Sequence, residues 1–102
     1  MVDPDATSRA NPNLRNVLHW LVVNIKGNDF TAAYTFANYW GPAPPAGSGL
    51  HRYAFYYFKQ TGVLDLTGTT PGTRLNFSLK DFAVKYNLGN PVAGNFFQAQ
   101  PA

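Results

Sequence analysis

Two histidines and two aspartates are the residues of this chain whose chemistry is most suggestive. His51 follows residues 41–49, a stretch that holds three prolines and three glycines. Prolines fix the backbone of such a loop, and glycines let backbone N–H groups approach a ligand closely. The pattern predicts a preformed pocket with the His51 ring at its rim, and a plain connecting loop is the alternative.

His19, Asp3 and Asp5 are the other residues with the chemistry of a site. His19 is the one ionisable group in the apolar residues 18–25, which are rich in β-branched and aromatic side chains. Asp3 and Asp5 flank a proline, and in an extended segment both carboxylates would lie on one side. Each pattern also has an ordinary explanation: a hydrogen-bonded core histidine, and aspartates that accept backbone N–H groups in a turn.

The chemistry that these residues suit best is the binding of an anion. Histidine N–H groups and the N–H groups of a glycine-rich loop both donate to phosphate oxygens. A carboxylate that accepts a hydrogen bond from the far nitrogen of a histidine orients the ring and favours its charged form. A metal site built from the same four side chains is the alternative, but no pair has the i, i+4 spacing of a helical site. We therefore predict no metal ligands.

Catalytic patterns are sparse in this sequence. It contains no GxSxG, HExxH or GxxxxGK[ST] motif. We predict no catalytic residues, no cofactor and no enzymatic activity. A small hydrolase that uses Asp3 or Asp5 with His51 is the minor alternative.

Composition limits the classes of protein and partner. The chain has 102 residues, enough for one domain or part of one, and 45% of them are apolar. Only 13% are charged, which suggests surface that a further chain covers. The net charge of +3 reflects scarce acids without a basic cluster, so we expect no nucleic-acid partner. No apolar run is long enough for a transmembrane segment. The lack of cysteine fits a cytoplasmic location, with secretion left open.

The elements that would position these residues are mainly strands. Residues 18–25 and 50–60 each read as a strand with two apolar faces, buried on both sides in a layered sheet. Within 50–60, Arg52 faces away from His51, so we expect it to anchor a carboxylate or backbone carbonyl groups. Residues 92–100 predict a last strand.

A loop and a short helix are predicted between the last two strands. Residues 61–73 are rich in glycine and threonine and predict a loop. Ser78 is the expected N-cap of a short helix that Gly89 ends. The buried stripe predicted for this helix consists of Leu79, Phe82, Ala83 and Tyr86.

Four segments together resemble the phosphatidylethanolamine-binding protein family, which includes the Raf kinase inhibitor proteins and the plant flowering-time regulators. They are DPDATSR (3–9), HWLVVNIKGN (19–28), GPAPPAGSGLHRY (41–53) and KYNLGNPVAGNFFQA (85–99). The resemblance implies a mainly β fold with an antiparallel sheet core and one short helix, as a partial domain over residues 1–102. This domain would lack the N-terminal strands and the C-terminal helix of the family. Self-association through open sheet edges is therefore expected.

The resemblance also implies a site and a function. The site is a shallow pocket for phosphate-bearing ligands, either a phospholipid head group or a phosphorylated residue. The implied function is a non-enzymatic binding module that regulates kinases or proteases. The alternative is a structural or interaction fragment without a competent pocket. Carried over by residue, the ligand-binding set is Asp3, Asp5, His19, Gly41, Pro44, His51 and Tyr53.

Three residues depart from the family pattern near this site. Thr7 stands where the family usually has the proline of a rigid bend. Leu14 stands where some members place a tyrosine, which removes one hydroxyl. Ala43 replaces a common glycine of the loop, which restricts the approach of the backbone there.

Overall fold

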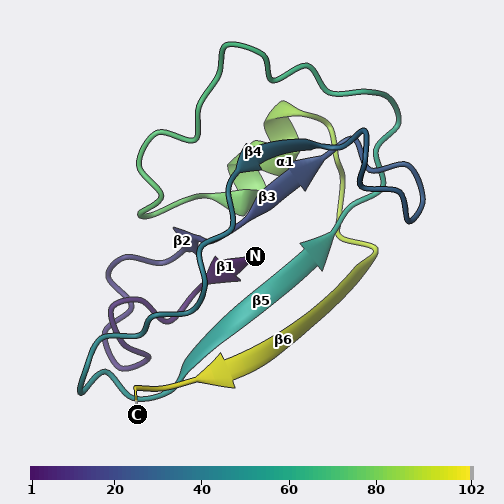
Figure 1. The fold of residues 1–102 in the computed structure, drawn as a ribbon. Helices are drawn as coiled ribbons and strands as arrows, with labels where there is room; N and C mark the ends of the chain where they lie inside the picture. The colour runs from purple at the N-terminus through teal and green to yellow at the C-terminus, as the bar shows by residue number, and fades with distance from the viewer. Residues whose placement is uncertain (102) are drawn as a thin grey trace.

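Two antiparallel sheets make up the computed structural model, which describes residues 1–101 (Figure 1). The smaller sheet pairs β3 (Leu21–Val23) with β4 (Tyr34–Ala37), and helix α1 (Leu79–Lys85) lies beside it (Figure 1). Over the described residues this is the antiparallel, mainly β fold with one short helix that we predicted. The larger sheet has the order β2-β1-β5-β6, formed by β1 (Val2–Asp3), β2 (Val17–Leu18), β5 (His51–Tyr57) and β6 (Ala93–Ala99).

The longest ladder pairs β5 with β6, from His51 opposite Ala99 to Tyr57 opposite Ala93. The strand predicted over 92–100 is thus confirmed to within one residue at each end. β6 is the last strand of its sheet and carries no charged residue. Such an uncharged edge is a surface on which another strand can pair. Self-association through this edge stays a prediction.

A small core forms where β1, β2 and β5 meet the smaller sheet. Val2 is at its centre, because it pairs with Leu18 of β2 on one side and with Ala54 of β5 on the other. Small domains bury little apolar surface, so each of these contacts carries much of the stability. The buried cluster consists of Val2, Leu18, Ala37 and Ala54.

The single strand predicted over residues 18–25 is wrong. The chain forms β2 and β3 in different sheets, with a break at His19 and Trp20. The N–H groups of both residues donate to the carbonyl of Met1, at 2.8 and 3.2 Å, and the carbonyl of His19 accepts the N–H of Trp40 at 2.8 Å. Backbone groups used in this way cannot continue a regular ladder. His19 is therefore fixed at the crossing between the two sheets.

The strand predicted over residues 50–60 is confirmed as β5, which ends three residues before the predicted end, but its burial on both sides is not confirmed. Tyr53 is 1% exposed, whereas Tyr56 and Tyr57 are 46% and 56% exposed. The latter two residues border a large groove between the sheets. The predicted packing on both faces therefore holds only for the first half of the strand.

Helix α1 begins as predicted and ends earlier. The Ser78 side chain accepts the backbone N–H three residues along the chain at 3.1 Å, which makes it the N-cap. The helix ends at Lys85, and Asn87, with φ of 54°, takes the left-handed conformation before Gly89 does. Of the predicted stripe, Ala83 is buried and the other three residues are half-buried: Leu79, Phe82 and Tyr86. Within residues 1–101 no helix has the length and apolarity needed to cross a bilayer.

Asp5 ties the turn after β1 to β5. Its fully buried carboxylate accepts the backbone N–H of Arg52 at 2.8 Å and the side-chain Nε and Nη2 groups at 2.9 and 2.8 Å. These hydrogen bonds lower the pKa of Asp5 to about 2, although burial opposes the change. The role predicted for Arg52, to anchor a carboxylate, is confirmed.

Replacing this carboxylate should destabilise the fold in a pH-dependent way. We expect Asp5→Asn to lower the free energy of unfolding by about 2 kcal/mol at pH 7, because charged hydrogen bonds are lost in a buried position. The pKa of Asp5 is below its ordinary value of 3.8, so the stabilisation is complete above about pH 5 and is lost as the pH falls toward 2.

Denaturant unfolding at pH 7 and at pH 2.5 measures this difference. The gap between wild type and Asp5→Asn should shrink at the lower pH. Asp81→Asn, at an exposed position on α1, is the matched control and should change stability little at either pH. An equal gap at both pH values would contradict the role given to the Asp5 carboxylate.

Candidate functional site

A cavity of about 580 Å³ brings together most of the predicted site residues. Asp5 is the exception, because its carboxylate is turned toward Arg52 and does not line the cavity. The other predicted residues come from β1, the break after β2, the loop after β4, and β5. The six that line the cavity are Asp3, His19, Gly41, Pro44, His51 and Tyr53.

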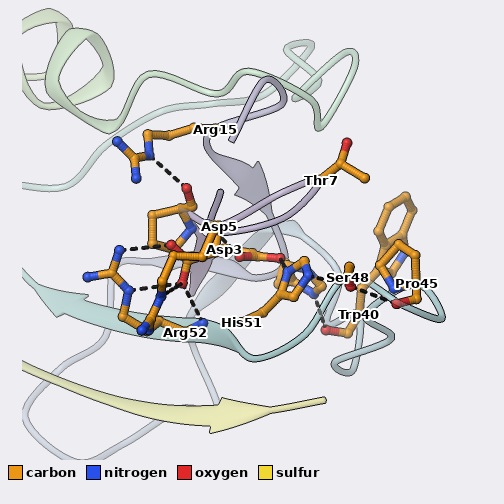
Figure 2. Close-up of polar contacts among 12 residues, drawn as sticks. Asp3, Asp5, Thr7, Arg15, Trp40, Pro45, Ser48, His51 and Arg52 are labelled. Carbon is orange, nitrogen blue, oxygen red and sulfur yellow. Dashed lines mark hydrogen bonds and ion pairs between the residues drawn. The ribbon is translucent and has the colours of Figure 1, made fainter. Parts of the chain in front are cut away.

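A buried hydrogen bond to Asp3 holds the ring of His51 in place (Figure 2). Its Oδ2 atom lies 2.7 Å from His51 Nδ1, and both side chains are buried. Its Oδ1 atom accepts the backbone N–H of Asp5 at 2.8 Å, which is the local turn contact considered from the sequence. A carboxylate only accepts, so Nδ1 of His51 carries the proton in this hydrogen bond.

The second nitrogen of His51 is also held by the protein. Nε2 lies 2.8 Å from Ser48 Oγ, and Oγ lies 2.6 Å from the carbonyl of Pro45 (Figure 2). The carbonyl can only accept, so the Ser48 hydroxyl proton belongs to the shorter contact and Nε2–H donates to Oγ. These contacts fit a His51 ring that donates from both nitrogens, with the Nδ1 proton shared with the carboxylate of Asp3.

The order aspartate, histidine, serine resembles the geometry of a hydrolase triad, but the contacts favour a different role. A nucleophilic serine must give its proton to the histidine, whereas the Ser48 hydroxyl donates to Pro45. Ser48 is also not among the residues that line the cavity. The geometry thus favours Ser48 as a support for the ring of His51.

His19 presents a ring nitrogen to the cavity. Its Nδ1 lies 2.9 Å from the carbonyl of Trp40, which can only accept, so Nδ1 carries a proton. Nε2 has no hydrogen-bond partner within residues 1–101. Every buried polar side-chain atom in that range does have one, so Nε2 is not buried. It is therefore open to the cavity that His19 lines. The neutral ring accepts a hydrogen bond at Nε2, and the protonated ring donates one there.

Tyr53 supplies a phenol between the two histidines. Its ring meets that of His19 edge-on at 5.2 Å and stacks on that of His51 at 6.3 Å. Burial raises the pKa of Tyr53 to about 12, and the charge of Asp3 adds to the rise. The phenol therefore keeps its proton at neutral pH.

The side chain of Arg74 contacts both His19 and Trp40. It belongs to residues 58–78, which contain no helix or strand, in agreement with the loop predicted over 61–73. Its Nη1 group lies 3.3 Å from the carbonyls of Leu18 and His19, and its guanidinium carbon lies 3.8 Å from the centre of the Trp40 ring. Arg74 thus fixes both His19 and Trp40, and the carbonyl of Trp40 accepts the hydrogen bond from Nδ1 of His19.

Two glycines of the loop are required by the conformation of its backbone. Gly47 and Gly49 take φ values of 78° and 77°, which side chains strongly disfavour. Gly41 lines the cavity, yet a Cβ atom there would meet only the Tyr39 ring, at an ordinary contact distance of 3.8 Å. The turn after Pro45 therefore needs its glycines for conformation.

The three departures from the family pattern all border the cavity: Thr7, Leu14 and Ala43. Thr7 donates its hydroxyl to Oδ1 of Asn13 at 2.8 Å, and the peptide bond before it is cis. Leu14 and Ala43 make their part of the wall apolar. No three His, Asp or Glu side chains within residues 1–101 lie close enough to hold a metal ion.

Three residues around the site were missed from the sequence. Ser48 and Trp40 each carried a signal, because Ser48 lies three residues before His51 and Trp40 directly precedes the Gly/Pro loop. Arg74 carried none, since its carbonyl partners lie 55 and 56 residues away along the chain.

Comparisons with known proteins agree with this architecture. Putative odorant-binding protein A5 of Drosophila melanogaster is 40% identical over 105 residues, which cover 98% of this chain and 50% of that protein. The crystal structure of carboxypeptidase Y inhibitor complexed with its cognate proteinase matches with a TM-score of 0.86 and 29% identity, over 99% of this chain and 57% of that one.

A further solved structure and a family model make the same assignment. The phosphatidylethanolamine-binding protein from Plasmodium vivax matches with a TM-score of 0.73 and 28% identity, over 99% of this chain and 61% of that one. The chain spans about half the length of the curated relative it matches. The model of the phosphatidylethanolamine-binding proteins covers residues 1–97, so the chain belongs to the phosphatidylethanolamine-binding protein family.

Proposed function

We propose that this chain is a non-enzymatic binding module whose cavity takes a phosphate-bearing group. The observation that carries the proposal is the orientation of His19, whose Nδ1 is committed to the Trp40 carbonyl and whose Nε2 reaches the cavity. On protonation Nε2–H becomes a charged donor that points at the bound group. The phenol of Tyr53 adds a second polar group.

The charges around the cavity support an anionic ligand of modest affinity. With a proton on each nitrogen, the ring of His51 offsets the carboxylate of Asp3, so that this pair leaves no net charge in the wall. A second proton on His19 then gives the cavity one positive charge. Neither lysine nor arginine lines the cavity, so His19 is its one switchable cation among the described residues. Anion binding should therefore depend on the protonation of this ring.

Phosphate binding should depend on the ring of His19. We expect inorganic phosphate to shift the ring signals of His19 in ¹H–¹⁵N NMR spectra at pH 5.5, because Nε2 of this ring faces the cavity. His19→Gln should weaken binding at pH 5.5 roughly tenfold, because one charged hydrogen bond is lost.

Two organic phosphates separate the sources of the ligand. Glycerophosphoethanolamine stands for a lipid head group, and a phosphoserine peptide stands for a phosphorylated residue. The compound that binds with the higher affinity identifies the ligand class. Unchanged signals from both histidine rings at millimolar concentrations of all three compounds would refute the proposal.

Arg74 should act on phosphate binding through His19. Arg74→Met removes both hydrogen bonds to carbonyl groups and the charge over the Trp40 ring. We expect phosphate affinity at pH 5.5 to fall about fivefold, and the ¹⁵N shifts of His19 to show loss of the single Nδ1–H tautomer, because the ring is no longer fixed. Arg74→Lys should retain part of the affinity.

Lys80→Met is the matched control, since it removes one positive charge from an exposed position on α1. It should leave the His19 signals unchanged. If Arg74→Met weakened binding no more than Lys80→Met does, Arg74 would contribute only through its net charge.

Regulation of a protease or a kinase is the wider role that we propose. The similarity to carboxypeptidase Y inhibitor, a structure determined with its proteinase, favours the protease. The alternative is a fragment without a competent pocket, favoured by the engagement of both His51 nitrogens inside the protein. A cytoplasmic location, which the cysteine-free sequence favours, belongs to the same proposal.

A further inference from the structure

A second and larger cavity lies away from the histidines. This groove has a volume of about 840 Å³ and runs between the two sheets beside α1, and it shares no lining residue with the first cavity. Its volume is within the range of small-molecule binding sites. Its walls are mainly apolar and include Trp20 and Val22 on one side, Phe55 and Tyr57 on the other, and Phe82 of α1.

Large apolar side chains in this groove are open to solvent. Phe30 is 58% exposed, Tyr57 is 56% exposed and Val63 is 82% exposed. Single exposed apolar residues are common, but a contiguous exposed group around a groove is typical of a binding surface. The groove is therefore suited to an apolar ligand or partner segment.

The charges at the groove select among apolar occupants. Lys26 and Lys59 line it, whereas no aspartate or glutamate does. Neither lysine forms an ion pair within residues 1–101. Met1 also lines the groove, and its amino group donates to the carbonyl of Trp20 at 2.7 Å. Burial lowers the pKa of this amino group to about 6, so the positive charge of the groove at pH 7 comes chiefly from the two lysines.

We propose that the groove binds an amphiphile with an apolar chain and an anionic head, for which a medium-chain fatty acid is the model. The chain would lie among the aromatic side chains, and the head would pair with Lys26 or Lys59 at the rim. Apolar burial supplies most of the affinity, and the lysines supply the preference for a negative head.

A second copy of the chain fits the groove less well. In a two-fold dimer the same surface meets itself, so Lys26 and Lys59 of one copy would approach those of the other. No acidic residue of the groove would offset them. The same charge complementarity that favours an anionic head thus disfavours a symmetric contact.

Calorimetric titration of the full chain at pH 7 and low salt tests the proposal with three ligands of equal chain length. Laurate, dodecanol and dodecylammonium are added below their aggregation concentrations. Laurate should bind at least about fivefold more tightly than dodecylammonium, with dodecanol between them, and its advantage should fall as salt is added. Saturating phosphate should leave laurate binding unchanged, because the two cavities are separate.

Substitutions at the rim locate the head group. The double variant Lys26→Met and Lys59→Met should weaken laurate about fivefold and leave dodecanol unchanged, since both side chains are exposed and bear only on the charge. The matched control, Lys80→Met and Lys85→Met on α1, should bind laurate as wild type does.

Three outcomes would overturn the proposal: no laurate binding, equal affinity for all three ligands, or equal loss in the two double variants. Analytical ultracentrifugation in parallel tests whether a second copy of the chain occupies the groove. A concentration-dependent dimer that excludes laurate would assign the groove to a second copy instead.

Discussion

The buried hydrogen bond between Asp3 and His51 is the interaction on which the rest of the site depends. It joins β1 to the first residue of β5 and is possible because Val2 pairs directly with Ala54 in the same sheet. Burying two charged groups costs more desolvation free energy than their attraction recovers, unless every remaining polar atom of the pair also forms a hydrogen bond. Here the backbone N–H of Asp5 donates to Asp3, and the hydroxyl of Ser48 forms a hydrogen bond with Nε2 of His51. No buried polar side-chain atom within residues 1–101 is left without a partner.

The two aspartates of the first turn perform separate tasks through this arrangement. Asp3 holds His51 on the cavity side, and Asp5 holds Arg52 on the other side of β5. Neighbouring residues of a strand face opposite sides, so two carboxylates that reach successive strand residues must diverge. The turn that follows β1 allows this, which is why Asp5 lies outside the cavity although its spacing from Asp3 suggested a shared face.

The sequence predicted the local features of this fold well, because they depend on nearby residues. The strand at 50–60, the last strand and the Ser78 cap follow from side-chain type and spacing alone. The set of cavity residues came from the family resemblance, and the residues alone indicated only the histidines, the aspartates and the Gly/Pro loop. The break at His19 depends on carbonyl and N–H groups of Met1 and Trp40, which no local pattern reveals.

Two cavities with different chemistry follow from one arrangement of sheets. The first forms where the crossing between the sheets meets the Gly/Pro loop, and its polar groups are fixed in number and direction. The second lies between the two sheets beside α1, and it is mainly apolar and lined by two lysines. Anion recognition in the first therefore depends on hydrogen-bond geometry, whereas binding in the second depends on burial and on charge.

The ring protonation of the ligand-free chain tests the central claim most directly. A long-range ¹H–¹⁵N NMR spectrum at pH 7 reports which nitrogens of each histidine carry a proton. The geometry predicts that the proton between His51 Nδ1 and Asp3 is protected from exchange, and that neutral His19 carries its proton at Nδ1. A freely exchanging His51 ring, or a neutral His19 protonated at Nε2, would contradict this account of the site.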